Sequence, residues 1–442
     1  MSLGRETARK VLARVETEGA FAAAALAAET MTLKDEREAA LAFELVLGCL
    51  RRESWLDHLL SSVSDRGLKK IDPAVMRILR IAAYQIAFLS RIPAAAAVND
   101  AVNACKRTRA ARLAGLTNAL LRKVASLPEA SLRPAETDDG AAIDVLTLRC
   151  GLPELVLAEL IERFGRDGAL GIAQTFNGPS RRTLRINRHR ISREDAATRI
   201  GERSTLGRLS PWAVDAPSMR SAAPLIESGL AAYQDEAAQL AVIALAPEPS
   251  DAVLDACAGR GGKTAAIAAL MEGNGQIAAV DRAGAKLDRL AFELSKQQLR
   301  AETAVCDLST APPPFAESFD RVLVDAPCSG SGTLGRRPEI RRRLTRASVD
   351  ELIAIQRAVL ANAARAVRPG GRLVYVVCSL LQGEGFGQEA SFTSAHPNFS
   401  LVSSPPPDWP AEVPWQGGRI LIDPSLYQTD GYQFLVFERA DS

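Results

Sequence analysis

The sequence lacks paired cysteines and an excess of either charge. Its seven cysteines, an odd number, include no C-x-x-C pair, which argues for reduced thiols in the cytoplasm and against a disulfide framework or a zinc site. Lys and Arg exceed Asp and Glu by only 54 − 52 = 2, so no global field selects a partner, although basic residues fall in local runs. Aromatic residues make up 5% of the chain, which argues against a broad platform for stacking bases.

Long apolar runs are also missing. No stretch is apolar enough to cross a bilayer, and the charged N-terminal segment "MSLGRETARKVLARVETEG" does not resemble a signal peptide. At 442 residues, of which 47% are hydrophobic, the chain is too long for one ordinary core. We therefore expect a soluble cytoplasmic protein of two or three domains that does not bind membranes.

The character of the sequence changes along the chain. Residues 5 to about 125 place apolar residues three and four apart almost throughout, as in "PAVMRILRIAAYQIAFL", which predicts helices. A stretch rich in Pro, Ser and acids follows, and beyond it helical patterns at 153–165 and 192–202 mix with a strand-like "RTLRINR". These changes predict an all-helical domain at 1–128, a linker at 129–142, a small α+β connecting domain at 143–230 and a larger domain at 231–442.

Short β runs alternate with helical stretches after residue 250. The five runs are "DAVLDACAG", "GQIAAVDRA", "AETAVCDLS", "FDRVLVDAP" and "GRLVYVVCS", and "GYQFLVFER" is read as a closing strand. Such alternation predicts an α/β domain with a doubly wound, mostly parallel sheet of the Rossmann type. Ligands of these sheets bind beyond the carboxyl ends of the strands, so the polar residues at those ends are the candidates for a site.

A glycine-rich turn follows the first of these strands, in "LDACAGRGGKT". Gly259, Gly261 and Gly262 let the backbone pass close to a ligand, although the spacing is not that of a Walker A loop, and a tight strand-to-helix turn explains them equally well. Asp281 ends the next strand, 281 − 255 = 26 residues after Asp255. An acid there can accept both ribose hydroxyls of a nucleoside, or it can cap the following helix.

Asp307 ends the third strand in "AVCDLS". It could accept a hydrogen bond from an adenine amino group, and a turn Asp is nearly as good an explanation for this residue alone. Three polar strand ends beside one glycine turn together describe a nucleoside pocket.

Two cysteines stand at the ends of adjacent predicted strands. Cys328 follows the strand that ends near Asp325, and Cys378 ends the next strand in "LVYVVCS". Neighbouring strands would bring both thiols to one rim beside the nucleoside pocket, where the arginines of 336–343 could hold a polyanion. The other cysteines are read as small buried hydrophobic residues: Cys49, Cys105, Cys150, Cys257 and Cys306.

A nucleoside cofactor, two thiols and an acid together suit methylation of a pyrimidine. C5 of a pyrimidine is a poor nucleophile, but a thiolate that adds to C6 makes C5 electron-rich enough to attack an electrophilic methyl group. An acid at N3 stabilises the charge that develops, and a second thiol can help release the product once the C5 proton leaves.

These residues resemble a known family, the bacterial RNA cytosine-C5 methyltransferases of the Sun or Fmu type. The resemblance covers nearly the whole chain and rests on "YQDEAAQLA", "LDACAGRGGKT", "VDRAGAKLDRL", "DAPCSGSGTLGRRPEI", "VVCSLLQGEG" and "TDGYQFLVFER". The Asp-Ala-Pro-Cys-Ser-Gly-x-Gly run with a later Cys-Ser is its most specific part. DNA cytosine methyltransferases resemble the chain less, since they rely on one Pro-Cys thiol, so DNA is not expected as the substrate.

The resemblance implies a role for each candidate. Cys378 would add to cytosine C6, Cys328 would assist release of the methylated product, and Asp325 would contact the cytosine and the cofactor. S-adenosylmethionine would lie across the glycine turn, with Asp281 on the ribose and Asp307 near the adenine. The implied cofactor-binding residues are Cys257, Ala258, Gly259, Arg260, Gly261, Gly262, Lys263, Asp281, Asp307 and Asp325.

The helical N-terminal part resembles the antitermination-factor (NusB-like) RNA-binding domain. "RIPAAAAVNDAVNACKRTR" and "LTNALLRKV" carry this likeness, and the domain is fused to the enzyme in the ribosomal RNA small-subunit methyltransferase B group. The fusion implies small-subunit (16S) ribosomal RNA as the substrate, and a monomer is expected. Basic runs at 106–123, 181–193 and 336–346 would then contact phosphates, although each run taken singly is also typical of a solvated face.

The chain departs from the family pattern at three places. Arg260 stands where Pro is usual, Val377 stands where Thr is usual, and "QGEG" replaces a Pro-Glu-Glu-Asn-like run, which leaves Glu384 as the remaining acid. Two alternatives therefore stay open beside methylation of 16S ribosomal RNA. One is the same chemistry on transfer RNA or another RNA, and the other is a catalytically decayed RNA-binding ribosome assembly factor.

Overall fold

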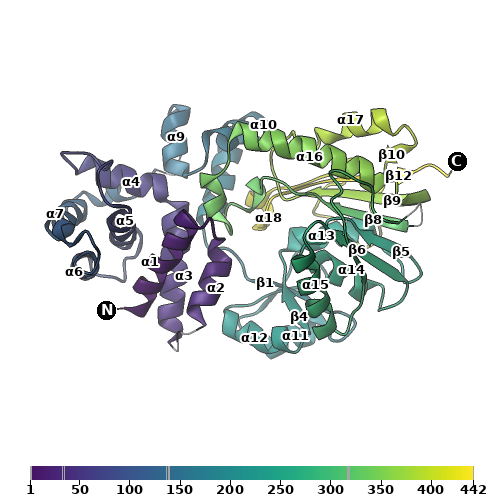
Figure 1. The fold of residues 1–442 in the computed structure, drawn as a ribbon, viewed down its shortest axis with the longest axis horizontal. Coiled ribbons are helices and arrows are strands. Elements are labelled where there is room, and N and C mark those ends of the chain that lie inside the picture. The colour runs from purple at the N-terminus through teal and green to yellow at the C-terminus, as the bar shows by residue number, and fades with distance from the viewer. Residues whose placement is uncertain are drawn as a thin grey trace. The chain divides into compact units, whose positions relative to one another are not determined.

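The computed structural model describes residues 2–31, 33, 35–135, 137, 140–315 and 319–441. They form two compact units, whose helices and strands are labelled in Figure 1. The first, here called the helical unit, runs to Pro179 and also contains Leu334–Arg343. The second, the sheet unit, comprises Ser180–Thr333 and the chain from Leu344 onward.

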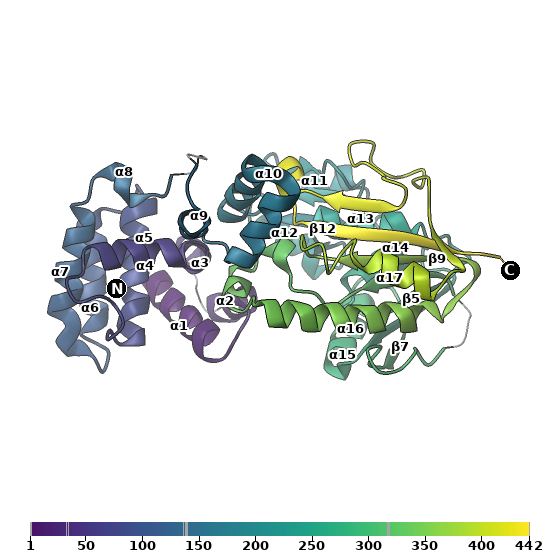
Figure 2. The same ribbon diagram turned by 90° about the horizontal axis from the view of Figure 1, so that it is seen from above.

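The described regular structure of the helical unit is entirely helical, as predicted. Its helices are α1 (Leu3–Thr17), α2 (Ala22–Thr30), α3 (Glu36–Arg51), α4 (Glu53–Ser62), α5 (Pro73–Phe88), α6 (Ala94–Cys105), η1 (Ala111–Leu113), α7 (Ala114–Ala125), α8 (Glu129–Leu132), α9 (Ile143–Cys150), α10 (Glu154–Asn177) and η3 (Pro338–Arg342). Figure 2 shows α4, α5, α6 and α7 lying side by side.

Helix α5 illustrates how the sequence encodes these helices. The side chain of Asp72 accepts a hydrogen bond from the backbone N–H of Ala74 (2.8 Å), and Pro73, which has no N–H to leave unpaired, occupies the first position. Buried residues then recur three and four apart, as Val75 and Ile78 do, so one face packs into the core. None of the helices in the described residues is long and apolar enough to cross a membrane.

Ten residues from late in the sequence belong to the helical unit. They include Arg341, whose buried guanidinium donates to the carbonyl of Arg51 (2.6 Å) and to Oδ1 of Asn177 (3.0 Å). Arg51 in turn donates to the carbonyl of Gly335 (2.6 Å). Burial lowers the pKa of Arg341, and the charge of Arg51 lowers it further. Arginine keeps its proton at neutral pH even so, and the carbonyl dipoles compensate its buried charge.

The prediction that the arginines of 336–346 contact phosphates is wrong for Arg341, which is enclosed by backbone carbonyls. Arg342 pairs with Glu53 (3.3 Å) and Glu16 (3.6 Å) inside the same unit but is partly exposed, so its contact with phosphate stays a prediction. A cluster of arginines in the sequence gave no sign that part of it is inserted among helices from the N-terminal half.

A small antiparallel sheet opens the sheet unit. Its strands are β1 (Thr183–Ile186), β2 (Thr205–Leu206), β3 (Ala213–Asp215) and β4 (Ala231–Tyr233), in the order β2-β3-β1-β4, with helices α11 (Arg193–Ile200) and α12 (Met219–Glu227). The predicted strand "RTLRINR" is β1. Its Arg185 is 2% exposed and donates to Oε1 of Gln297 (3.1 Å), so the expected phosphate contact of the run 181–193 is wrong for this residue.

The compact units cut across the connecting domain expected at 143–230. Helices α9 and α10 lie in the helical unit, and the small sheet lies in the sheet unit. Residues 136, 138 and 139 of the expected linker at 129–142 lie outside the described residues. The boundaries at 128, 142 and 230 stay a prediction about which parts fold independently.

The main sheet has eight strands in the described part of this unit, and the predicted doubly wound, mostly parallel arrangement is confirmed. The strands are β5 (Ala252–Asp255), β6 (Gln276–Asp281), β7 (Glu302–Val305), β8 (Phe319–Asp325), β9 (Val367–Val377), β10 (Phe399–Leu401), β11 (Arg419–Ile422) and β12 (Tyr432–Arg439). Their order is β10-β12-β9-β8-β5-β6-β7, with β11 paired to β12. Strands β5 to β9 pair in parallel, and β12 runs antiparallel to β9.

The direction of winding reverses between β5 and β8. From β5 the chain proceeds to β6 and β7 on one side, and it then returns to β8 and β9 on the other side. Ligands of open α/β sheets bind beyond the carboxyl ends of the strands at such a reversal. The segments that follow β5 and β8 are therefore the ones that the fold places at a binding site.

Side chains from successive residues of β8 pack on opposite faces of the sheet. Leu323 contacts the cluster that includes α13 (Glu236–Leu245) and α14 (Gly262–Leu270), whereas Val322 and Val324 contact the cluster that includes α16 (Arg346–Ala364) and α17 (Gln388–Ala395). Figure 1 shows α13, α14 and α15 (Gly284–Lys296) on one face and α16 and α17 on the other. The remaining short helices are η2 (Ser331–Thr333) and α18 (Pro424–Tyr427).

Replacing Arg341 by Ala is expected to lower the free energy of unfolding by at least about 2 kcal/mol, because several buried acceptors lose a charged donor. Arg342→Ala is the matched control, since it removes ion pairs of a side chain that is 35% exposed, and it should cost less than about 1 kcal/mol. Urea unfolding of the full chain, followed by circular dichroism, measures both values. Equal losses would contradict the buried role of Arg341.

Candidate active site

The turn between β5 and α14 lies at the switch point, which is the place between β5 and β8 where the direction of winding reverses. Gly259 and Gly261 have φ angles of 56° and 85°, a region that suits glycine. A Cβ on Gly261 would lie 2.6 Å from Cγ of Leu290, so this position also needs a residue without a side chain. A Cβ on Gly259 would meet nothing within 4 Å, so the outer side of the turn is open to a ligand.

Asp281, at the end of β6, binds this turn. Its Oδ2 accepts from the N–H of Gly259 (3.0 Å) and its Oδ1 from the N–H of Ala283 (2.9 Å), while the ammonium of Lys286 lies 3.3 Å away. The side chain does not cap α15, which begins at Gly284. Asp281 therefore couples the ends of two adjacent strands, as expected of a residue in a shared pocket.

Asp307 lies two residues beyond β7. Its Oδ1 accepts from the backbone N–H (3.0 Å) and the hydroxyl (2.6 Å) of Ser309, and these two hydrogen bonds lower the pKa of Asp307. This is a local turn of the kind that Asp commonly forms. Its second oxygen, Oδ2, is not the acceptor in either bond.

Asp325, at the end of β8, forms an ion pair that the sequence did not predict. Nζ of Lys263, from the first turn of α14, lies 2.6 Å from its Oδ2. Burial alone would lower the pKa of Lys263, but the charge of Asp325 and this hydrogen bond outweigh burial and raise it. Nζ also lies 5.7 Å from the ring centre of Tyr432. The pair joins the glycine turn to the strand that leads to Cys328.

The structure brings the two candidate thiols together. Sγ of Cys328 and Sγ of Cys378 are 3.1 Å apart, both cysteines are free, and both are half-buried. The contact with Cys378 and burial together raise the pKa of Cys328 well above its usual value.

Glu384 binds both segments that carry these sulfurs. Its side chain is 0% exposed, and Oε1 accepts from the backbone N–H of Ser329 (2.7 Å) and from Nε2 of Gln356 (3.0 Å). Its Oε2 accepts from the hydroxyls of Ser329 and Ser379, the latter at 2.6 Å. Because each serine directly follows a cysteine, one carboxylate fixes both Cys-Ser pairs.

Backbone bonds reinforce this connection. The N–H of Gly332 donates to the carbonyl of Cys378 (3.1 Å), and the hydroxyl of Ser331 accepts from the N–H of Leu380 (3.0 Å). The N–H of Gly431 donates to the carbonyl of Gly332 (2.8 Å). The segments after β8 and β9 are therefore tied along their length, and the approach to β12 is tied to them.

The departures from the family pattern leave these contacts in place. Arg260 is exposed on the outer side of the glycine turn, and Glu384 comes from the "QGEG" segment itself. Asp255, at the end of β5, is fully buried, and its Oδ2 accepts from the hydroxyl of Thr264 (2.7 Å). Burial raises the pKa of Asp255 to about 6.

The other cysteines take no part in the thiol pair. Cys257 is half-buried in the glycine turn, and burial raises its pKa well above the usual value. Cys306, after β7, is also only half-buried, so the expectation that Cys257 and Cys306 are buried is corrected for both. Cys49, Cys105 and Cys150 are buried in the helical unit as expected.

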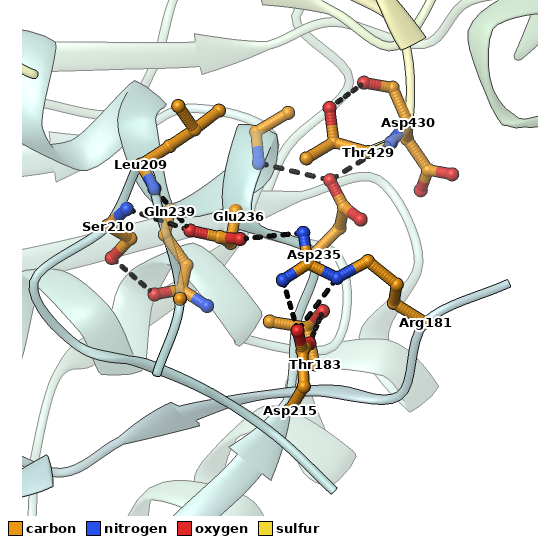
Figure 3. Close-up of polar contacts among 12 residues, drawn as sticks. Arg181, Thr183, Leu209, Ser210, Asp215, Asp235, Glu236, Gln239, Thr429 and Asp430 are labelled. Carbon is orange, nitrogen blue, oxygen red and sulfur yellow. Dashed lines mark hydrogen bonds and ion pairs between the residues drawn. The ribbon is translucent and has the colours of Figure 1, made fainter. Parts of the chain in front are cut away.

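The acids of "YQDEAAQLA" fix the start of α13. Figure 3 shows Asp235 accepting from the N–H groups of Ala237 (3.0 Å) and Asp430 (3.2 Å). Glu236, 0% exposed, accepts from the N–H of Leu209 (2.6 Å) and lies 3.2 Å from the guanidinium of Arg181. Arg181 is thereby paired inside the protein, so a phosphate contact in the run 181–193 is not its role.

Two family models match the chain. Residues 242–434 match the model described as 16S rRNA methyltransferase RsmB/F, and residues 3–126 match the model of the NusB family. The first match spans β5 to β9 with both cysteines, and the second spans α1 to α7.

Similar proteins extend over nearly the whole chain. A Synechocystis protein named probable ribosomal RNA small subunit methyltransferase B is 31% identical over 90% of each chain, and a Bacillus subtilis protein of the same name is 30% identical over 97% of each. The crystal structure of PH0851 has a TM-score of 0.83 at 22% identity over 99% of each chain. NSun6 from Pyrococcus horikoshii, solved with SFG, has a TM-score of 0.56 at 18% identity over 66% of this chain and 99% of its own. These two structures support the fold, and the sequence relatives establish that the chain belongs to the ribosomal RNA small-subunit methyltransferase B family of S-adenosylmethionine-dependent methyltransferases, of the Sun or Fmu type.

Proposed function

We propose that the protein methylates C5 of a cytosine in 16S ribosomal RNA through a covalent bond between Cys378 and cytosine C6. The observation that carries the proposal is the 3.1 Å approach of Cys328 and Cys378 from the ends of adjacent strands. Both cysteines lie beside the switch point, where β8 ends at Asp325 and the glycine turn follows β5. Two thiols and an ion pair converge there, and a thiol that can add to C6 is what methylation of pyrimidine C5 needs.

The residues at the switch point fit S-adenosylmethionine. The outer side of Gly259 is open, and Asp281 and Asp307 supply carboxylates for the ribose and adenine ends. Nearby, Oε1 of Gln234 is buried without a hydrogen-bond partner among the described residues, so the pocket holds an unused acceptor. When bound, the cofactor supplies the electrophilic methyl group. We assign its contacts to Cys257, Ala258, Gly259, Arg260, Gly261, Gly262, Lys263, Asp281, Asp307 and Asp325.

We assign the nucleophile to Cys378, as the family resemblance implies, with the sulfur of Cys328 in contact with it at 3.1 Å. The sulfur of Cys378 bonds to C6, and the electron pair of the C5–C6 double bond then attacks the methyl group from C5. Removal of the C5 proton by a base returns the C5–H electron pair to the ring and expels the Cys378 thiolate. We assign this step to Cys328, which accepts the C5 proton as a thiolate.

The ion pair of Lys263 and Asp325 gives a means of stabilising charge that develops on the ring. Asp325 accepts a hydrogen bond from the ammonium of Lys263, and we propose that the same ammonium donates a hydrogen bond to N3. The aromatic face of Tyr432 beside Nζ adds to the stabilisation of the cation.

The choice of RNA follows from the relatives. The matching proteins are named for the small ribosomal subunit, and a NusB-type helical unit accompanies the catalytic part in this chain. Transfer RNA, methylated by the same chemistry, remains the competing substrate. Bisulfite sequencing of total RNA from cells with and without the gene decides, because the target cytosine loses its protection only when the gene is deleted.

A decayed cofactor pocket is less well supported. That alternative was motivated by Arg260 and "QGEG", yet Arg260 is exposed and Glu384 holds both cysteine segments. Calorimetric titration with S-adenosylmethionine is expected to give saturable heat, and its absence would favour a binding protein without activity.

Cys378→Ala is expected to abolish methyl transfer to a small-subunit RNA transcript, because no sulfur remains to add to C6. Cys328→Ala should instead lower turnover by about 10²-fold or more and leave protein covalently bound to RNA, seen as a slow band on a denaturing gel. Cys306→Ala, a half-exposed thiol at the end of β7, is the matched control and should be fully active. Full activity in Cys378→Ala would refute the nucleophile assignment.

Glu384→Gln is expected to lower kcat by about 10²-fold. The amide NH₂ of the glutamine would face N–H and O–H groups that now donate to the carboxylate, so these hydrogen bonds would be lost and the two sulfurs would separate. Affinity for S-adenosylmethionine, measured by calorimetry, should be unchanged, since no contact of Glu384 reaches the glycine turn. If Glu384→Gln has the same kcat and the same affinity as the unaltered protein, the carboxylate has no positioning role.

Glu389→Gln is the matched control for that substitution. Glu389 lies five residues further along and pairs with Arg419, a side chain that is 44% exposed. Its replacement should change neither kcat nor affinity, because an exposed ion pair contributes less than about 1 kcal/mol.

A further inference from the structure

The turn between α1 and α2 presents an aromatic ring to solvent. Gly19, with φ 65°, reverses the chain after α1, and Phe21 stands directly before α2. The Phe21 side chain is 51% exposed, whereas the next residue, Ala22, is fully buried. A large apolar ring at a turn of this kind contributes little to the core.

Two residues of the segment 334–343 hold this turn from both sides. Arg343 donates to the carbonyl of Gly19 (2.6 Å), and Oε1 of Glu339 accepts from the N–H of Ala22 (3.2 Å). Glu339 is itself 1% exposed, so the second anchor is part of the packed interior. Phe21 therefore lies between two anchored residues, Gly19 and Ala22, and the hydrogen bonds of their backbone keep its ring toward solvent.

Two guanidinium groups accompany the ring. Cζ of Arg343 lies 5.6 Å and Cζ of Arg337 lies 6.0 Å from the ring centre, and both side chains are exposed. Within the part of the chain that the structure describes, the hydrogen bond of Arg343 goes to a backbone carbonyl, and both arginines act electrostatically on the buried carboxyl of Glu339. The surface thus combines one exposed aromatic face with positive charge.

This combination suits an unpaired nucleotide. Bases of single-stranded RNA stack on aromatic rings and on guanidinium planes, and arginines pair with phosphate oxygens. We infer that Phe21, Arg337 and Arg343 form a binding site for an unpaired nucleotide of the substrate RNA, with the base on Phe21 and the flanking phosphates on the arginines. The inference rests on the proposed function in taking RNA as the substrate.

In the sequence, Arg337 follows Cys328 by 337 − 328 = 9 residues. Arg337 and Arg343 belong with Phe21 to the helical unit, so all three residues of the proposed site lie in one compact unit.

A second exposed phenylalanine provides a matched control. Phe292 on α15 is 53% exposed and has Arg289 (5.2 Å) and Lys296 (6.0 Å) near its ring. Both of these cations pair with Glu293, at 2.5 and 3.9 Å, so their charges are already compensated. Phe292 has nearly the same exposure as Phe21, but both cations beside its ring pair with one surface carboxylate.

Fluorescence anisotropy with a short, fluorescein-labelled, single-stranded RNA of mixed sequence tests the site in the full chain. Phe21→Ala is expected to weaken binding about tenfold, and Phe21→Trp, which keeps a ring to stack on, should bind like the unaltered protein. Arg337→Gln should reduce the slope of log Kd against log salt concentration by about 0.7, because one phosphate contact is lost. Phe292→Ala should bind as the unaltered protein does, and a duplex of the same RNA should be insensitive to Phe21→Ala.

The inference is overturned if Phe21→Ala binds the single strand as tightly as the unaltered protein while Phe21→Trp does the same. An equal loss in Phe292→Ala, or an equal loss for the duplex, would also overturn it, because either result removes the stacking on Phe21 as the cause. These measurements contain no methyl donor, so a failure of the proposed methylation would leave their outcome unchanged.

Discussion

Glu384 accepts hydrogen bonds from residues on both cysteine-bearing segments, and the geometry of the site depends on this. Its two oxygens meet four donors: the N–H and hydroxyl of Ser329, the hydroxyl of Ser379 and the amide of Gln356. Hydrogen bonds to a buried carboxylate are about twice as strong as neutral ones, so together they hold two loops that no disulfide joins. The 3.1 Å approach of the sulfurs follows from this arrangement.

The segment after β8 is fixed at both ends. On one side the N–H of Gly332 donates to the carbonyl of Cys378 (3.1 Å), and two residues later the carbonyl of Leu334 accepts from Arg341 (3.4 Å) in the helical unit. The chain passes from the sheet unit to the helical unit between Thr333 and Leu334, shortly after the loop that carries Cys328.

The fold was predictable because its signals are local. Apolar spacing identified the helices before 125, and strand-helix alternation identified the parallel sheet and hence the shared rim of Cys328 and Cys378. The inserted segment was not predictable, because charge pattern alone cannot distinguish the buried Arg341 from an exposed arginine. The role of Glu384 and the pair of Lys263 with Asp325 depend on contacts between residues 55 and 62 positions apart, which no local pattern encodes.

Mild oxidation with diamide, followed by peptide mapping of the native full chain, tests most directly whether the two sulfurs share one site. The structure predicts a disulfide between Cys328 and Cys378 as the first product, formed faster than any disulfide of Cys257 or Cys306, because only this pair has its sulfurs in contact. The same treatment of Glu384→Ala should form it more slowly. Recovery of Cys328 and Cys378 as separate free thiols under conditions that oxidise the other half-buried cysteines would contradict the account.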